Sequence, residues 1–201
     1  MTKFDHLSLF LEAINSQEIE NIYNCLDFPN ADDTLALARL GIIGSFDFDY
    51  AGRRCPIRVS WIEPLERNRF EISKNGKRAA IVKVFDWDDC CIDLLALDME
   101  TRWTGCLLGR LGIIGDGLYT ANLGAPLLAH RNAASWLASK REGIVILDPI
   151  QARSILMDYK GPQKPLVVAD HHYAKRLKSA LEWRPAIEVN PKVFKTWGAA
   201  A

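Results

Sequence analysis

Residues 143–183 have the sequence GIVILDPIQARSILMDYKGPQKPLVVADHHYAKRLKSALEW, and this stretch decides the fold class of the second half of the chain. Two uniformly apolar runs, 143–147 and 165–169, are each followed by a segment with helical periodicity. Pro149 suits the first turn of the first such segment. Apolar strands that alternate with helices favour parallel pairing under a cover of helices. We therefore expect an α/β layer with short parallel strands.

The same alternation continues outward on both sides of this stretch. Residues 130–142, HRNAASWLASKRE, have helical spacing, and residues 186–190, AIEVN, are a possible short strand. The predicted order from residue 130 is therefore helix, strand, helix, strand, helix and a final strand.

Residues 45–98 show period-two alternation instead, which is typical of antiparallel strands. The runs are SFDFDY at 45–50, PIRVSWI at 56–62, RFEIS at 69–73, RAAIVKVFDW at 78–87 and CCIDLLALD at 90–98. Asn75-Gly76, between the third and fourth runs, predicts a hairpin. In the last run, Ile92, Leu94 and Ala96 are expected to share one face.

The chain begins with two predicted helices. Residues 4–27 have apolar side chains at helical spacing with a break at Asn15-Ser16, and a second helix runs from the capping residue Asn30 to Gly41. The whole is an α+β protein: N-terminal helices, a central antiparallel sheet and a C-terminal α/β layer. We expect residues 1–125 and 126–201 to form two subdomains, or together one compact domain.

Composition excludes several classes of protein. The 201 residues include 25 Lys and Arg against 25 Asp and Glu, so a uniformly basic coat protein and an acidic DNA mimic are both excluded. Residues 1–20 predict an amphipathic helix rather than a signal peptide, and no run of about 18 apolar residues suggests a membrane span. The cysteines have irregular spacing, as expected of free thiols in a cytoplasmic protein: Cys25, Cys55, Cys90, Cys91 and Cys106.

One hexapeptide occurs twice. RLGIIG stands at 39–44 and again at 110–115. The favoured interpretation is that each copy ends a helix at its glycine and enters the next element. A duplicated supersecondary unit is the alternative.

Acidic and histidine side chains follow the two predicted C-terminal strands: Asp148 after the first, and Asp170, His171 and His172 after the second. If those strands are neighbours, their carboxyl ends face one crevice, where Asp148, Asp170 and His172 could bind Mg²⁺ or Mn²⁺ and act on a phosphate ester. The favoured interpretation is structural, because both aspartates are good N-caps for the helices that follow.

The segments VILDPIQARSIL and VVADHHYAKRL resemble toprim domains of primases, topoisomerases and small nucleases. The resemblance implies Mg²⁺-dependent phosphoryl transfer, with Asp148 where the family has glutamate, Asp170 retained and His172 in place of a second aspartate. This chain lacks the Glu-Gly of that family and has a shorter spacing between the two motifs.

Residues 110–181 also resemble uncharacterised proteins of bacterial prophages and other mobile elements. The features that carry this resemblance are RLGIIG, the Leu-Gly-Ala-Pro-Leu segment, His-Arg before a Trp-Leu helix, GIVILD and the final helix. It implies a bacterial origin and a role near nucleic acid, and no particular activity.

Charge is unevenly distributed along the sequence. Residues 1–30 have 1 basic and 5 acidic side chains (−4), residues 31–125 have 12 and 14 (−2), and residues 126–201 have 12 and 6 (+6). A basic helix face can contact phosphates through charge alone. Alternatively, the acidic N-terminal helices neutralise this region within the chain or across a dimer. The candidate contact residues are Lys175, Arg176, Lys178, Arg184, His130 and Arg131.

The leading hypothesis is a non-enzymatic interaction protein of a bacterial mobile element. Its basic C-terminal region would contact nucleic acid or an acidic protein partner, with no cofactor and no membrane. One alternative is a metal-dependent nuclease that uses Mg²⁺ or Mn²⁺ at Asp148 and Asp170. Another is a structural subunit that forms a homo-oligomer.

Overall fold

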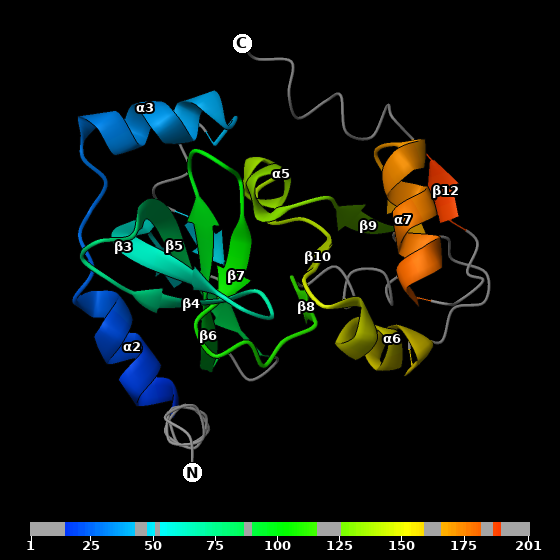
Figure 1. The fold of residues 1–201 in the computed structure, drawn as a ribbon, viewed down its shortest axis with the longest axis horizontal. Helices are drawn as coiled ribbons and strands as arrows, with labels where there is room; N and C mark the ends of the chain where they lie inside the picture. The colour runs from blue at the N-terminus through cyan, green and yellow to red at the C-terminus, as the bar shows by residue number, and fades with distance from the viewer. Residues whose placement is uncertain are drawn as a thin grey trace. The chain divides into compact units, whose positions relative to one another are not determined.

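The computed structural model describes residues 15–42, 48–50, 53–86, 90–115, 126–158, 166–181 and 187–189 (Figure 1). The chain forms two compact units, and each consists of two stretches of sequence. Unit 1 comprises residues 1–34 and 46–110, and unit 2 comprises residues 35–45 and 111–201. Unit 2 therefore begins earlier than the boundary expected near residue 125, and it includes a segment close to the N-terminus.

Two helices precede the strands, and both begin at capping boxes. In α2 (Ser16–Asn24), the Asn15 side chain accepts a hydrogen bond from the Glu18 amide, and Glu18 accepts one from the Asn15 amide. In α3 (Ala31–Arg39), Asn30 and Asp33 form the same reciprocal pair. Helix α2 begins at the predicted break, Asn15-Ser16, and the predicted helix start at Asn30 is confirmed. The part of the first predicted helix before residue 15 lies outside the described residues. No helix within the described ranges is long and apolar enough to cross a membrane.

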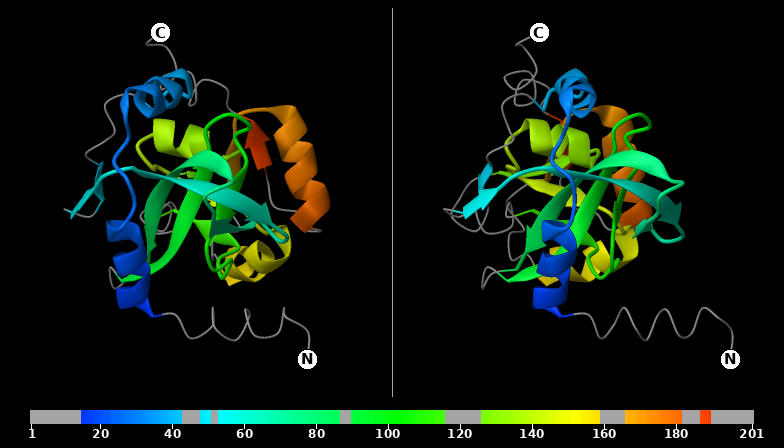
Figure 2. Two further views of the ribbon diagram at one scale, coloured as in Figure 1. Left: turned by 60° about the vertical axis from the view of Figure 1, so that its left-hand side comes forward. Right: turned by 90° about the vertical axis from the view of Figure 1, so that its left-hand side faces the viewer.

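Unit 1 contains a closed barrel of five strands and a separate two-stranded ribbon (Figure 2). The barrel order is β3-β4-β7-β6-β5, and its neighbouring strands are antiparallel except for the parallel pair β4 and β7. The predicted antiparallel sheet thus closes on itself through one parallel contact. The strand bounds are β1 (Phe48–Tyr50), β2 (Arg53–Cys55), β3 (Arg58–Leu65), β4 (Arg69–Ile72), β5 (Lys77–Phe85), β6 (Cys91–Asp98) and β7 (Thr104–Cys106).

The turn at Asn75-Gly76 does not join a hairpin, so that prediction was wrong. The strands on either side of it, β4 and β5, pair with opposite edges of β3, and Ile62 pairs with both Ile72 and Lys77. The connection crosses β3 so closely that a Cβ on Gly76 would lie 2.0 Å from the Ile62 carbonyl oxygen. Glycine is required here for close approach of two backbones rather than for a hairpin turn.

The hydrophobic cluster of unit 1 joins α2 to strand β6. Cys91, Leu94 and Ala96 of β6 pack with Ile19 and Tyr23 of α2. The predicted face contained Ile92 in place of Cys91. A register shift between Val84 and Phe85 explains the difference, because Val84 pairs with Asp93 and Phe85 with Cys91, so the intervening residue has no partner.

Asp93 is a carboxylate inside this unit, with no exposed surface. Its Oδ1 accepts hydrogen bonds from the amides of Leu94 at 2.7 Å and Leu108 at 2.9 Å. Burial raises the pKa of Asp93 to about 6, although these amides and the charge of Arg110 act in the opposite direction. Asp93 therefore fixes the backbone after β7 at the cost of burying a charge at neutral pH.

Unit 2 contains a five-stranded sheet in the order β12-β11-β9-β10-β8. All neighbours are parallel except β10 and β8, which confirms the predicted parallel layer. The central strand, β9, was not predicted from the sequence. The bounds are β8 (Ile113–Ile114), β9 (Leu127–His130), β10 (Ile144–Ile146), β11 (Leu166–Val168) and β12 (Ile187–Val189).

Helices cover both faces of this sheet. The predicted helices are α5 (Ala133–Ala138), α6 (Pro149–Asp158) and α7 (His171–Leu181). The chain moves one way across the sheet from β9 to β10, and the opposite way from β10 to β11 and on to β12. Right-handed crossovers then place α5 on one face and α6 with α7 on the other. Consistently, α6 packs against α7, and both contribute to one cluster with the sheet (Figure 1).

The two RLGIIG copies adopt different structures. The first ends α3: Gly41 has φ 80°, and the Ile42 amide donates to the Leu37 carbonyl at 3.0 Å, as in a Schellman motif. The second leads into β8 without ending a helix. The helix-end interpretation is confirmed for the first copy and wrong for the second.

Replacing Asp93 tests the buried charge. Above pH 6 the folded state holds an ionised, buried carboxylate, whereas at pH 4 the group is protonated in the folded state and only partly ionised in the unfolded state. Asp93→Asn keeps an acceptor and removes the charge. We expect its free energy of unfolding, relative to wild type, to rise by about 2 kcal/mol between pH 4 and pH 7.5. Urea unfolding at both pH values measures this, and an unchanged difference would contradict the assignment.

Candidate functional site

The parallel strands of unit 2 end at one edge of the sheet, where the predicted site residues lie. His130 is the last residue of β9, Asp148 follows β10, and Asp170 follows β11. Strand β9 lies between β10 and β11, so the condition for a shared cation site, that those two strands are neighbours, is not met. Adjacent strands are spaced about 4.8 Å apart, which puts β10 and β11 about 10 Å apart. His130, rather than Asp148, is on the strand beside the one that Asp170 follows.

Both aspartates cap helices, as the favoured interpretation predicted. Asp148 Oδ1 accepts from the Ile150 amide at 2.8 Å, and Asp170 Oδ1 accepts from the Tyr173 amide at 2.7 Å. His172 is exposed in the first turn of α7. In the described ranges, no group of three or more His, Cys, Asp or Glu side chains could hold a metal ion. The hypothesis of Mg²⁺ or Mn²⁺ at Asp148, Asp170 and His172 therefore gains no support from this geometry.

His130 is inside the unit and does not form a surface pair with Arg131. It is 2% exposed, and its Nε2–H donates to the Glu142 carbonyl at 2.8 Å, with the Ser139 hydroxyl at 3.2 Å. Burial lowers the pKa of His130 to about 4, so the ring is neutral at physiological pH. His130 thus anchors the turn after α5, and the candidate contact residue at this position is Arg131 alone, which is exposed.

Tyr173 connects α7 to the central strand. Its buried hydroxyl donates to the His130 carbonyl at 2.9 Å. Burial raises the pKa of this hydroxyl, and the charge of Arg176 opposes the shift. Arg131 directly follows His130 in the chain, Asp170 accepts from the Tyr173 amide, and Arg176 is about one helical turn beyond Tyr173. The connections after β9 and β11 leave in opposite directions, and such a switch point is where α/β sheets commonly bind ligands.

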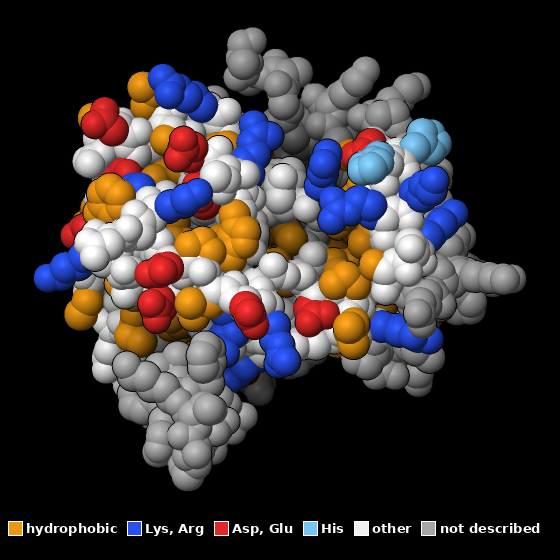
Figure 3. Space-filling view, in the orientation of Figure 1, with side chains coloured by type: hydrophobic (Ala, Val, Ile, Leu, Met, Phe, Trp, Pro, Cys, Tyr) orange, Lys and Arg blue, Asp and Glu red, His pale blue; other side chains and the backbone are white. Residues whose placement is uncertain are grey.

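The exposed face of α7 is basic. Tyr173, Ala174 and Leu177 are buried against the unit, whereas the His, Lys and Arg side chains of the helix are all exposed to solvent. Figure 3 shows blue and pale-blue side chains gathered over this helix. The exposed residues are His171, His172, Lys175, Arg176 and Lys178. Within the described part of the chain, the last three make no ion pair; Arg184 lies outside the described residues.

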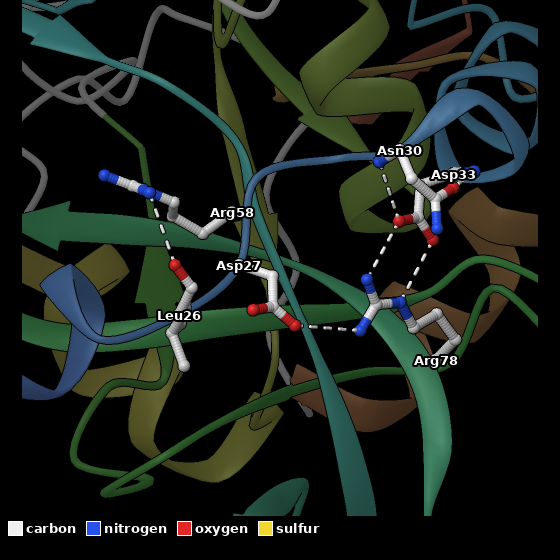
Figure 4. Close-up of polar contacts among 6 residues, drawn as sticks. All are labelled: Leu26, Asp27, Asn30, Asp33, Arg58 and Arg78. Carbon is white, nitrogen blue, oxygen red and sulfur yellow. Dashed lines mark hydrogen bonds and ion pairs between the residues drawn. The ribbon is translucent and has the colours of Figure 1, made fainter.

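The acidic residues near the N-terminus pair within unit 1 (Figure 4). Arg78 of β5 donates from Nε and Nη2 to the two carboxylate oxygens of Asp33 at 3.1 and 2.9 Å, and its Nη1 lies 3.5 Å from Asp27 Oδ2. Lys83 of the same strand lies 3.2 Å from Glu20. Burial alone would raise the pKa of Asp33, but the bonds from Arg78 and Asn30 lower it overall.

This pairing bears on the two interpretations of the uneven charge. Glu20, Asp27 and Asp33 pair with the cations of β5, so they do not neutralise α7. The segment after α2 is held on the barrel by a second arginine, since Arg58 Nη1 donates to the Leu26 carbonyl at 3.3 Å (Figure 4). Among the described residues, Lys175, Arg176 and Lys178 make no ion pair, and these three carboxylates are engaged on β5.

Comparison of the chain with protein-family models, curated proteins and solved structures finds no match. The resemblances to toprim domains and to prophage proteins stay predictions. Sequence reasoning also missed Tyr173, the residue that ties the basic helix to the sheet. Its signal was an aromatic residue on the apolar side of a helix whose other side is basic.

Removing Arg78 would strand a buried carboxylate. We expect Arg78→Ala to lower the free energy of unfolding at pH 7 by about 2 kcal/mol, because Asp33 would lose its charge partner. The double variant Asp33→Asn/Arg78→Ala removes the stranded charge and keeps the helix cap, so it should be more stable than Arg78→Ala. Chemical denaturation measures both. A double variant that is no more stable than the single one would show that the charge is not the cause.

Replacing His130 should change the pH dependence of stability. In the unfolded chain the ring binds a proton near pH 6.5, whereas in the folded state it does so only near pH 4, so stability falls as the pH drops between these values. His130→Gln keeps an N–H donor and cannot titrate. Relative to wild type, its free energy of unfolding should rise by about 3 kcal/mol between pH 7.5 and pH 4. A constant difference across this range would rule out a buried neutral ring.

Proposed function

We propose that this protein is a non-enzymatic interaction protein whose second unit binds a polyanionic partner, nucleic acid or an acidic protein, through the basic face of α7. One observation carries the proposal: Lys175, Arg176 and Lys178 are exposed together without an ion pair among the described residues, while acidic residues near the N-terminus pair on β5. A clustered positive face raises the local concentration of anions and speeds their association.

The clustering has an energetic consequence for the helix itself. Lys175 and Lys178 are three positions apart, so they are neighbours on the helix surface and repel each other by a few tenths of a kcal/mol. The capping carboxylate Asp170 is at the opposite end of α7 from Lys178. A polyanion would relieve this repulsion, which gives the bound state an advantage that the free protein lacks.

A cytoplasmic location belongs with this proposal. The described cysteines, Cys25, Cys90, Cys91 and Cys106, are all free thiols, as is usual in a reducing compartment. The further assignment to a bacterial mobile element depends on the resemblance of residues 110–181.

A matched pair of charge reversals tests the proposal. Lys175→Glu changes the proposed surface, and Lys74→Glu makes the same charge change at an exposed turn of unit 1. On a column carrying inorganic polyphosphate, Lys175→Glu should elute at clearly lower salt than wild type, and Lys74→Glu should elute near wild type. Circular dichroism of both variants verifies the fold. Equal shifts for the two variants would indicate a response to total charge only and would reject the proposed surface.

A further inference from the structure

The composition of the α7 face favours one kind of polyanion. Protein interfaces usually have an apolar or aromatic centre and are depleted in lysine. No large hydrophobic side chain of α7 is exposed among its described residues; the exposed ones lie elsewhere, at Phe28, Leu35, Trp61, Ile72, Ile150 and Ile155. A face of cations without an apolar centre fits a phosphate backbone better than a folded protein surface.

The arrangement of the cations fits a rigid and dense line of charge. With a rise of about 1.5 Å per residue, Lys175, Arg176 and Lys178 lie within about 5 Å along the helix axis. Arg131 adds a cation just after β9, next in sequence to His130, whose carbonyl accepts from the Tyr173 hydroxyl. Duplex DNA carries one charge per about 1.7 Å of its axis. The four side chains can therefore meet several phosphates at once.

The same face has few means of recognising bases. Helix α7 carries no Asn, Gln, Asp or Glu side chain, the types that pair with adenine or cytosine edges, so reading of bases by this helix is largely limited to contacts of Lys and Arg with guanine. Tyr173 of this helix is buried, so its ring cannot stack on an unpaired base. We infer that α7 and Arg131 form a docking surface for the phosphate backbone of duplex DNA, bound without base-specific contacts; this inference rests on the proposed function.

Replacing Asp170 distinguishes a DNA-docking surface from a metal-dependent enzyme. The Asp170 carboxylate caps α7 and acts on Tyr173 together with Arg131 and Arg176, so it is a negative charge beside the docking surface. Asparagine caps helices as well as aspartate does. Asp170→Asn should therefore bind duplex DNA more tightly than wild type, whereas a metal-dependent enzyme would lose a ligand with the same substitution.

The test is fluorescence anisotropy with a labelled 20-base-pair duplex. Four phosphate contacts correspond to a salt slope of about −3.6, or about 100-fold weaker binding at 200 mM than at 50 mM salt. Arg131→Gln should reduce the magnitude of this slope by about 0.9, because one phosphate contact is lost. Asp170→Asn should tighten binding at 50 mM salt about 2- to 5-fold, as expected for removing one nearby like charge. Lys74→Glu is the control and should match wild type.

Each contrary outcome has a distinct meaning. Retention on polyphosphate without binding to the duplex would overturn the inference and leave the proposed function standing, and binding to neither would overturn both. Tighter binding to poly-glutamate or to the single strand than to the duplex would overturn the choice of partner. A more than 10-fold preference between two duplex sequences would overturn base-independent binding. Weaker binding of the duplex by Asp170→Asn would contradict the inference that Asp170 is a repelling negative charge beside the docking surface.

Discussion

The ion pair between Arg78 and Asp33 is the interaction that attaches the start of α3 to strand β5. A carboxylate that is 4% exposed is stable only with a close partner, and the guanidinium supplies two parallel hydrogen bonds to it. Because Asp33 is also the third residue of α3 and part of its capping box, one side chain fixes both the start of the helix and its attachment to β5. Asp27 extends the same arrangement along the segment between the two helices.

The consequence for function lies in the other unit. Glu20, Asp27 and Asp33 are paired with cations of their own unit, so these three carboxylates do not cancel the positive excess of the C-terminal region. The strand order of unit 2 then determines where the two aspartates lie that precede its helices α6 and α7. Strand β9 separates the ends of β10 and β11, and each following helix uses its aspartate as a cap. Asp148 and Asp170 thus follow strands that are not neighbours, and each caps its own helix.

The sequence predicted the features that depend on local signals. The starts of α6 and α7 follow from Pro149, Asp148 and Asp170, and the uniformly apolar runs at 144–146 and 166–168 correctly indicated buried parallel strands. Features that depend on pairing between distant segments could not be obtained in this way. The Asn75-Gly76 pair indicates that the chain turns. It does not indicate that β4 and β5 pair with opposite edges of β3.

The candidate site likewise combines features that the sequence predicts with features that depend on tertiary structure. Basic residues on α7 are visible in the sequence, and helical spacing places them on one face. Their exposure could not be deduced, because net charge by segment does not say which charges meet. His130 illustrates the limit: beside Arg131 in sequence it suggests a surface pair, yet it ends a strand that runs through the centre of the sheet and its ring is buried.

A net charge of zero is compatible with binding a polyanion because electrostatic forces in salt solution are local. At physiological ionic strength the screening length is about 8 Å, so a phosphate near α7 responds mainly to the side chains of that face. Carboxylates that are already paired with arginine or lysine project little field beyond their partners. If α7 binds a polyanion as proposed, its exposed cations set the affinity, and Asp170, which caps this helix, has more influence than the total charge of the chain.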